Sequence, residues 1–173
     1  MVEAKPAAFL DRDGVINIDR GYVGRVGDFE LIEGAAEAIS ALNRSGYLVF
    51  VVTNQSGIGR GYFTEADFLE VTAHMNTLLA RRGAHIDDIR YCPYHPTAKL
   101  ARYRAHHSWR KPAPGMILDI LQKWEVDLDS SFLIGNSARD LDAAQAAGIN
   151  SFLFQEGNLL DFLQSTALKI DLA

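Results

Sequence analysis

Two aspartates one residue apart, Asp11 and Asp13, are the residues whose types and spacing most directly suggest chemistry. They follow a short apolar run, residues 7–10, and Gly14 comes next. If the run is an extended strand, side chains two residues apart point to the same side. Two carboxylates so close repel each other unless a cation or a proton lies between them. The pattern alone also fits a strand that simply ends in a polar loop.

Three further polar stretches carry groups that complement this pair. Residues 53–56 offer a hydroxyl and turn amides that can cradle a phosphate. Arg110 and Lys111 supply a bidentate fork and a compact positive charge. Residues 135–140 offer amide and carboxylate oxygens, which Mg²⁺ prefers. Singly, these stretches are typical of an ordinary turn, a solvated patch and a helix first turn. Together they predict phosphoryl transfer, whose catalysis rests mainly on positioning and charge stabilisation.

The elements that must hold these stretches alternate along the chain. Thr64 with Asp67, and Pro114, mark two helix starts, and glycines mark helix ends. Apolar runs predict strands over 7–11, 47–52, 89–94, 131–134 and 151–154. Amphipathic runs predict helices over 34–45, 64–83, 114–124, 141–147 and 159–168. This order predicts an α/β fold with a doubly wound, mainly parallel sheet of five strands or more.

The chain is expected to form a single domain over residues 1–173. Two long irregular stretches, 14–33 and 93–113, are expected to be loop insertions near the site. In doubly wound sheets, ligands bind outside the carboxyl ends of the strands. Because each polar stretch follows a predicted strand or precedes a helix, we expect all of them on this one rim.

Composition limits the partners. The formal net charge is −5 and there is no basic stripe, which argues against nucleic acid and anionic membranes. The longest apolar run, 47–52, is too short to span a bilayer, and no signal peptide is expected. With one cysteine, Cys92, no disulfide can form within the chain. We expect a cytoplasmic monomer that acts on a small molecule.

Four motifs resemble, in order, those of the haloacid dehalogenase (HAD) superfamily of phosphatases. They are FLDRDG at 9–14, TNQSG at 53–57, RKP at 110–112 and GNSARD at 135–140. Within this superfamily, residues 54–64 and 111–116 are similar to the branch that acts on heptose bisphosphates, close kin of the histidinol-phosphate phosphatases. The resemblance covers nearly the whole chain. It implies a Rossmann-like HAD fold with only small cap insertions and a Mg²⁺-dependent phosphatase that forms an aspartyl-phosphate.

The resemblance also implies roles for the matched residues. Asp11 would be the nucleophile and Asp13 the general acid and base. Thr53 would bind the phosphate, and Lys111 would stabilise its charge. The implied contacts to the phosphorylated sugar, with Arg110 on its second phosphate, are Asp19, Tyr22, Asn54, Gln55, Ser56 and Arg110. The implied Mg²⁺ ligands are Asp11, the main-chain carbonyl of Asp13, Asn136 and, directly or through water, Asp140.

Asn136 departs from the family pattern, which usually has aspartate at this position. An amide oxygen can still ligate Mg²⁺, but it brings no charge. Because hard cations depend on the number of carboxylates, we expect weaker Mg²⁺ binding than in the usual member.

The loop that commonly holds a structural zinc ion in this family also differs. Its Cys-x-His and Cys-x-Cys positions here carry Cys92, Tyr94, His107 and Trp109. Tetrahedral zinc needs four Cys or His ligands. Cys92, His95, His106 and His107 could in principle replace the family's ligands. Adjacent histidines such as His106 and His107 rarely reach the same ion, which argues against this set. We expect no structural zinc and a loop held by packing of Tyr94, Tyr103 and Trp109.

The sequence leaves alternative functions open. A phosphatase for a heptose bisphosphate is the leading hypothesis, and histidinol phosphate is the alternative substrate. Histidinol phosphate has no second phosphate for Arg110 to bind. A phosphate-binding protein with weakened catalysis stays possible because of Asn136. A phosphatase that processes nucleic-acid ends is disfavoured by the acidic charge.

Overall fold

The computed structural model describes residues 4–167. Its centre is a five-stranded parallel sheet in the order β3-β2-β1-β4-β5. The strands are β1 (Lys5–Leu10), β2 (Leu48–Asn54), β3 (Asp88–Cys92), β4 (Val126–Gly135) and β5 (Asn150–Leu153). The doubly wound parallel sheet predicted from the sequence is confirmed.

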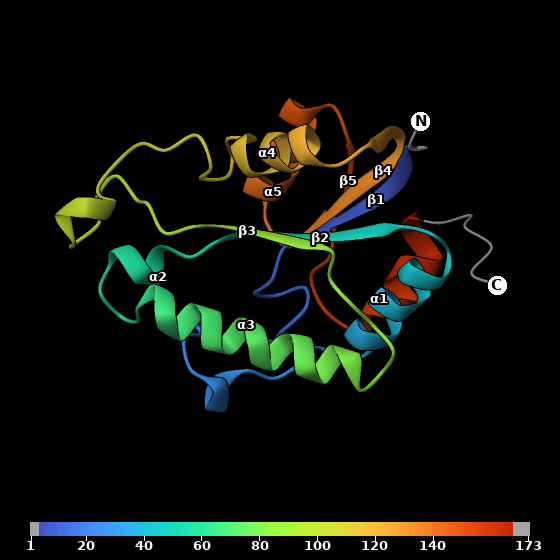
Figure 1. The fold of residues 1–173 in the computed structure, drawn as a ribbon, viewed down its shortest axis with the longest axis horizontal. Helices are drawn as coiled ribbons and strands as arrows, with labels where there is room; N and C mark the ends of the chain where they lie inside the picture. The colour runs from blue at the N-terminus through green and yellow to red at the C-terminus, as the bar shows by residue number, and fades with distance from the viewer. Residues whose placement is uncertain (1–3, 168–173) are drawn as a thin grey trace.

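Helices cover both faces of the sheet (Figure 1). One face carries α4 (Gly115–Lys123) and α5 (Ala138–Ala147). The other carries α1 (Ala35–Arg44), α3 (Glu65–Ala80) and α6 (Leu159–Phe162), which continues as a π-helical turn over Leu163–Ala167. A short helix, α2 (Ser56–Gly59), lies directly after β2.

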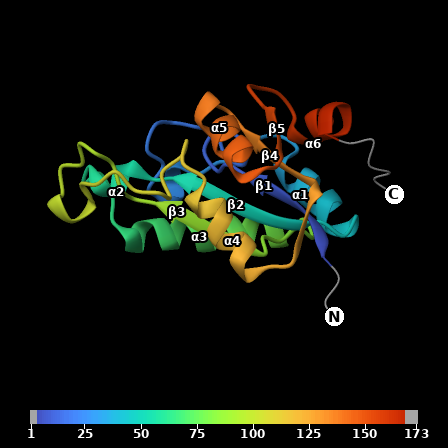
Figure 2. The same ribbon diagram turned by 90° about the horizontal axis from the view of Figure 1, so that it is seen from above.

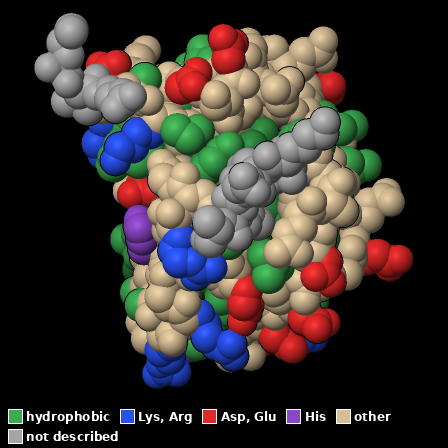
Figure 3. Space-filling view, turned by 90° about the vertical axis from the view of Figure 1, so that its right-hand side faces the viewer, with side chains coloured by type: hydrophobic (Ala, Val, Ile, Leu, Met, Phe, Trp, Pro, Cys, Tyr) green, Lys and Arg blue, Asp and Glu red, His purple; other side chains and the backbone are tan. Residues whose placement is uncertain are grey.

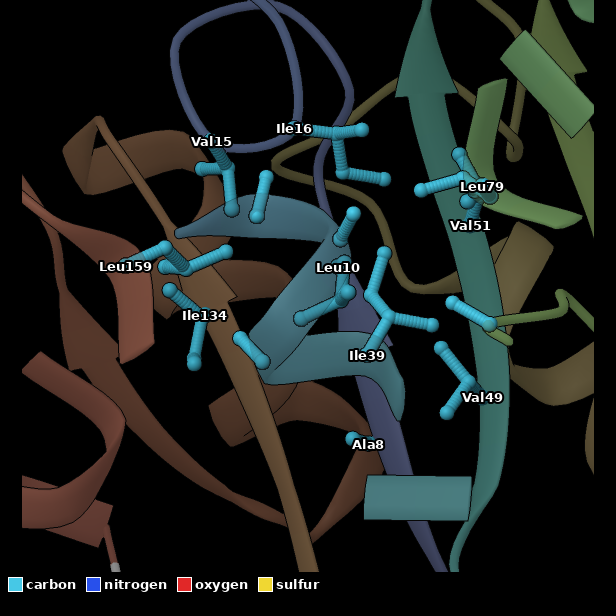
Figure 4. Packing of buried hydrophobic residues seen from close by; sticks show 14 of the residues in the cluster. Ala8, Leu10, Val15, Ile16, Ile39, Val49, Val51, Leu79, Ile134 and Leu159 are labelled. Carbon is cyan, nitrogen blue, oxygen red and sulfur yellow. The ribbon is translucent and has the colours of Figure 1, made fainter. Parts of the chain in front are cut away.

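The core follows from the alternation of side chains along the strands. In β1, Ala8 and Leu10 face the α1 side, whereas Ala7 and Phe9 face the α4 side. Figure 4 shows Leu10 with Ile39, Val51 and Ile134 on the first of these faces. Because β1 is buried on both faces, its run is apolar without a break, and it ends rigidly held at Asp11.

Strand β4 begins five residues earlier than the sequence predicts. Its first half, residues 126–130, alternates apolar and acidic residues and is half-buried or exposed, and its register against β1 shifts between Pro6 and Ala8. The Ser131 hydroxyl accepts a hydrogen bond from Ala7 N at 2.8 Å, which replaces a ladder bond at the bulge. The alternation of Val126 to Asp129 is short and is separated from the apolar run by this bulge, so sequence patterning predicts the start of the strand too late.

Other boundaries also differ from prediction. Helix α5 begins three residues before 141, Pro114 is the N-cap of α4 rather than its first residue, and α2 was not expected. The capping box of Thr64 and Asp67 is confirmed. The predicted end of the last helix, Leu168, lies outside the described residues.

The two expected loops, 14–33 and 93–113, lie toward the carboxyl ends of the strands, and Figure 2 shows the second beside α2 and beyond β3. Figure 3 looks at the other end of the molecule, where acidic and basic side chains are interspersed. Within residues 4–167, no helix has the length and apolar content needed to cross a bilayer.

Candidate active site

A cavity of about 440 Å³ opens at the carboxyl ends of β1, β2 and β4. It collects every residue predicted for the site except Thr53: Asp11, Asp13, Asp19, Tyr22, Asn54, Gln55, Ser56, Arg110, Lys111, Asn136 and Asp140. Four unpredicted side chains also line it: Arg60, His95, Ser137 and Arg139. Chain segments far apart in the sequence therefore meet on the rim that the strand order predicts.

Lys111 connects the end of β1, strand β2 and the first turn of α5. Its Nζ lies 3.0 Å from Asp11 Oδ1 and 2.6 Å from Asp140 Oδ1, and it donates to the Val52 carbonyl at 2.8 Å. The side chain is only 3% exposed. Burial would lower the pKa of Lys111, but Asp11 and Asp140 outweigh burial and raise that pKa above its usual value. Lys111 is therefore charged at neutral pH.

The two carboxylates respond differently to their surroundings. Burial raises the pKa of Asp11 to about 6, with Lys111 opposing this effect and Asp140 adding to it. Burial also acts to raise the pKa of Asp140, but Lys111 and hydrogen-bond donors hold that pKa below its usual value. Burial therefore dominates at the proposed nucleophile Asp11, whereas Lys111 and the hydrogen-bond donors dominate at Asp140.

Asp140 connects Lys111 to the turn before α5. Its Oδ2 accepts hydrogen bonds from the main-chain N–H groups of Asn136 and Ser137, at 3.0 and 3.1 Å, and from the Ser137 hydroxyl at 3.0 Å. Asp140 and Ser137 form a capping box at the helix start. Both Asp140 oxygens thus have protein partners, and direct metal ligation by Asp140 stays a prediction.

The main chain of Lys111 is fixed by Asn54. Asn54 Nδ2 donates to the Lys111 carbonyl at 3.1 Å, and Asn54 Oδ1 accepts from the Lys111 N–H at 3.0 Å. This pair joins the end of β2 to the far end of the 93–113 loop. Asn54 therefore has a positioning role besides any contact to substrate.

Asp13 is held by three side chains. Its Oδ1 accepts from Arg12 Nη2 at 3.0 Å and from Asn17 Nδ2 at 2.9 Å, and its Oδ2 accepts from Gln55 Nε2 at 2.9 Å. Arg12 is 1% exposed, donates to the Val23 carbonyl at 2.7 Å, and lies over the ring of Phe68. These bonds fix the orientation of the second carboxylate.

Thr53 lies behind the cavity wall. It is buried, and its hydroxyl accepts from Gln55 Nε2 at 2.9 Å. Gln55 thus links Thr53 to Asp13, while direct binding of phosphate by Thr53 stays a prediction. Ser56 begins α2, and Ser56 and Gly57 line the cavity at the first turn of this helix.

The first loop shapes one wall of the cavity. Asp19 Oδ1 accepts from Gly21 N at 2.9 Å, and this turn presents Tyr22 with a φ of 54°. A bulky residue with positive φ is rare and carries backbone strain. The Tyr22 ring packs edge-on against Tyr62 with centroids 4.8 Å apart.

The donor set around Asp11 and Asp13 fits a hard cation. It consists of oxygens, and one lysine is shared there between the carboxylates of Asp11 and Asp140. Asn136 Nδ2 donates to the Asp13 carbonyl at 3.2 Å, and the Asn136 side chain fills the space beside Gly14. Turning this amide about its last bond would place Oδ1 where Nδ2 now lies.

The 93–113 loop is held by aromatic packing in the place where the family has zinc ligands. Tyr94 stacks on His107 with centroids 4.2 Å apart, and Tyr94 also packs edge-on against Tyr103. Trp109 packs edge-on against His107, so the ring of His107, which the sequence-based prediction of this packing did not include, lies between Trp109 and Tyr94. Over residues 4–167, no group of three or more His, Cys, Asp and Glu side chains is placed to hold a metal ion.

Glu65 anchors the same loop to the sheet. Its carboxylate accepts hydrogen bonds from the hydroxyls of Tyr91 and Tyr103, each at 2.9 Å. Burial and this carboxylate raise the pKa of Tyr91 to about 12. The loop that carries Arg110 and Lys111 is therefore fixed at both its start and its middle.

Sequence reasoning missed Arg12, Asn17, Arg60 and Arg139 as site residues and gave Ser137 no role. One signal was present for Arg139, because a cation in the first turn of a helix opposes the helix dipole. Arg12 and Asn17 gave no such signal, since their contacts to Asp13 depend on how the loop folds back.

Comparisons with known proteins agree with this geometry. The family model for HAD-hydrolase-like proteins matches residues 108–165. A D-glycero-β-D-manno-heptose-1,7-bisphosphate 7-phosphatase from Rhodopseudomonas palustris is 46% identical over 169 residues, which cover 98% of this chain and 94% of the relative.

Solved structures show the same likeness. A putative HAD-like phosphatase from Mesorhizobium loti superposes with a TM-score of 0.82 at 37% identity, covering 87% of this chain and 72% of that one. D,D-heptose 1,7-bisphosphate phosphatase from B. bronchiseptica, complexed with magnesium and phosphate, has a TM-score of 0.80 at 35% identity. This second match covers 94% of this chain and 88% of the other.

Proposed function

Because this chain belongs to the D-glycero-β-D-manno-heptose-1,7-bisphosphate 7-phosphatases of the HAD superfamily, we propose that it hydrolyses the 7-phosphate of that sugar bisphosphate. The observation that carries the proposal is the junction at Lys111, where one buried cation joins Asp11 to Asp140 beside the fixed carboxylate of Asp13. This junction supplies a nucleophile, a positive charge and a proton carrier in one cavity.

In the first step, Asp11 attacks the phosphorus of the 7-phosphate. Its Oδ1 is occupied by Lys111 and by the main-chain N–H of Arg12 at 2.8 Å, which leaves Oδ2 for the attack. The bond between phosphorus and the sugar oxygen breaks, and Asp13 gives its proton to that oxygen. The products are a sugar that keeps its 1-phosphate and a phosphoryl group on Asp11.

In the second step, Asp13 takes a proton from water. The resulting hydroxide attacks phosphorus, the bond to Asp11 breaks, and inorganic phosphate leaves with Asp11 restored. Gln55, Asn17 and Arg12 keep Asp13 in one orientation for both proton transfers. Lys111 stays paired with Asp140 and stabilises the charge on the transferred group.

Mg²⁺ fits the oxygens of Asp11, the Asp13 carbonyl and Asn136, after the Asn136 amide has turned. When bound, the ion neutralises charge on the phosphoryl oxygens and on Asp11. Asn136 favours a second candidate function, a phosphate-binding protein with weak turnover, because the metal site loses one carboxylate.

Phosphate release tests the proposed function. Purified protein is assayed with both anomers of the heptose bisphosphate, with histidinol phosphate and with nucleotides, with Mg²⁺ and with EDTA. We expect the β anomer to have the highest kcat/KM and EDTA to abolish turnover. Higher kcat/KM for histidinol phosphate would overturn the substrate assignment, and tight binding without turnover would support the second candidate.

Size-exclusion chromatography tests the expected monomer, and fractionation of cells tests the proposed cytoplasmic location.

A further inference from the structure

Four side chains on the outer part of the cavity share an unusual property: they are hydrogen-bond donors with no acidic partner. These side chains, which we term the arginine rim, are Arg60, His95, Arg110 and Arg139. They come from the end of α2, the 93–113 loop and the first turn of α5. None of the three arginines forms a salt bridge within the part of the chain that the structure describes.

Arg60 and His95 face each other as two donors. His95 Nδ1 accepts a hydrogen bond from the Thr97 N–H at 3.0 Å, so the proton of the neutral ring is on Nε2. Arg60 Nη2 lies 3.5 Å from that Nε2, and a guanidinium cannot accept a hydrogen bond. Arg60 Nε is buried and has no partner in residues 4–167. An oxygen anion placed between these groups would satisfy both donors.

Arg139 occupies a position that costs stability. It is in the first turn of α5, where the helix dipole disfavours a cation. Its charge also acts on Arg110. Burial lowers the pKa of Arg110 below its usual value, and repulsion from Arg139 and Arg60 lowers that pKa further. An exposed arginine is ordinarily just solvated, but Arg139 adds a third guanidinium to a cavity that Arg60 and Arg110 already line.

We propose that Arg60, His95 and Arg139 join Arg110 to bind the phosphate that the enzyme does not hydrolyse, and that they set its preference for bisphosphates over monophosphates. A phosphate dianion has enough acceptor oxygens for several donors at once. It would relieve the repulsion among the three guanidinium groups and the unfavourable position of Arg139. The inference rests on the proposed function, since it assumes a sugar that carries two phosphates.

The kinetic test compares wild type with Arg139→Ala, Arg60→Ala and Arg139→Lys. Each is assayed with heptose 1,7-bisphosphate and with heptose 7-phosphate, which lacks the second phosphate. We expect each alanine variant to raise KM for the bisphosphate about tenfold and to change kcat/KM for the monophosphate less than about twofold. Arg139→Lys should restore most of the loss. Equal losses on both substrates, or no loss on the bisphosphate, would overturn the proposal.

The melting temperature of the free protein separates a binding role of Arg139 from a structural one. Arg139→Ala should raise Tm by about 1–3 °C, because it removes a cation from a helix N-terminus. The matched control is Arg81→Ala, at the C-terminus of α3, which should not raise Tm and should leave both substrates unaffected. A lower Tm for Arg139→Ala would show that Arg139 stabilises the fold, and this result would contradict the proposal.

Calorimetry separates failure of this inference from failure of the proposed function. If wild type releases no phosphate from the bisphosphate, the proposed function fails, and binding of heptose 1-phosphate still tests the rim. Weaker binding by Arg139→Ala, by about tenfold, with unchanged binding by Arg81→Ala, would then support the rim as a phosphate site. Unchanged binding by both variants would overturn it.

Discussion

Lys111 and Arg139 line the same cavity, but the protein surrounds their charges in opposite ways. Lys111 is 3% exposed and is paired with two carboxylates and a carbonyl. Arg139 is exposed, forms no salt bridge within the described residues, and lines the cavity together with Arg60 and Arg110. The inner cation is therefore paired with carboxylates before substrate arrives, whereas the proposed partner of the outer cations is the anion that the substrate brings.

The difference follows from burial. A buried charge without a partner costs several kcal/mol, so the inner groups must be paired for the protein to fold. Half-exposed arginines keep much of their hydration and tolerate one another at small cost. Removing the inner cation should thus cost both stability and activity, whereas removing a rim cation should change substrate preference without costing stability.

The largest expected effect on the inner part comes from Asp11→Asn. The amide cannot take the phosphoryl group, so kcat should fall by about 10⁴-fold or more. Folding should persist, since the amide oxygen can still face Lys111. Phosphate release by the variant is compared with that of Asp129→Asn, which changes an exposed aspartate of β4 and should keep full activity. Activity within tenfold of wild type would exclude Asp11 as the nucleophile.

Lys111→Met should show the cost of leaving the inner carboxylates unpaired. Asp11 and Asp140 lose their shared cation, and the free energy of unfolding should fall by about 3–5 kcal/mol. Denaturation by urea measures the loss. The matched control is Lys123→Met, which removes an exposed partner of Asp88 and should cost about 1 kcal/mol or less. Similar losses for both variants would remove the distinction between paired inner charges and surface charges.

Hydrophobic patterning was sufficient to predict the fold but not its exact boundaries. Strands β1 and β2 are apolar at every central position, as a parallel strand that is buried on both faces must be. The first half of β4 was not predicted, because its apolar–acidic alternation is short and a bulge, where Ser131 supplies a hydrogen bond, separates it from the apolar second half. Only the pairing with β1 makes that segment a strand.

The inner part of the site was predictable because its residues follow strands in a fixed order. The topology then brings Asp11, Asn54 and Asp140 to one edge of the sheet. The rim was not predictable in the same way. Arg60 and His95 reach the cavity through a short helix and a long loop, and the course of a loop does not follow from periodicity.

Asn136→Asp tests the metal side of the inner part. The carboxylate should tighten Mg²⁺ about tenfold, because it adds a charged oxygen ligand. Without metal the same change should destabilise the protein, since it replaces the 3.2 Å donation to the Asp13 carbonyl by a fourth nearby carboxylate. Mg²⁺ titrations followed by Tm, and Mn²⁺ binding followed by electron paramagnetic resonance, measure both effects. Unchanged affinity would mean that residue 136 is not a ligand.

The smallest expected effect is that of changing Asp88, an aspartate that is paired with cations but lies outside the cavity. It lies at the start of β3 and accepts hydrogen bonds from Arg90, Lys123 and Trp124 at 2.7, 2.9 and 3.0 Å. Burial acts to raise the pKa of Asp88, but these donors outweigh burial and hold that pKa well below its usual range. Asp88→Asn should lower the free energy of unfolding at pH 7 by about 1–2 kcal/mol and leave kcat/KM unchanged.

The pH dependence of this effect has a definite sign. Because the pKa of Asp88 is lowered in the folded state, its stabilisation is present above the unfolded value, about 3.9, and is lost as pH falls toward the lower folded value. Wild type and Asp88→Asn should therefore differ in stability by a constant amount from pH 7 to about pH 5 and converge below about pH 4. A difference in unfolding free energy that grew on acidification would contradict the lowered pKa of Asp88. A change in kcat/KM on Asp88→Asn would show that the ion pairs of Asp88, outside the cavity, contribute to catalysis as well as to stability. The contrast between the inner part and the arginine rim would then need a cause other than burial.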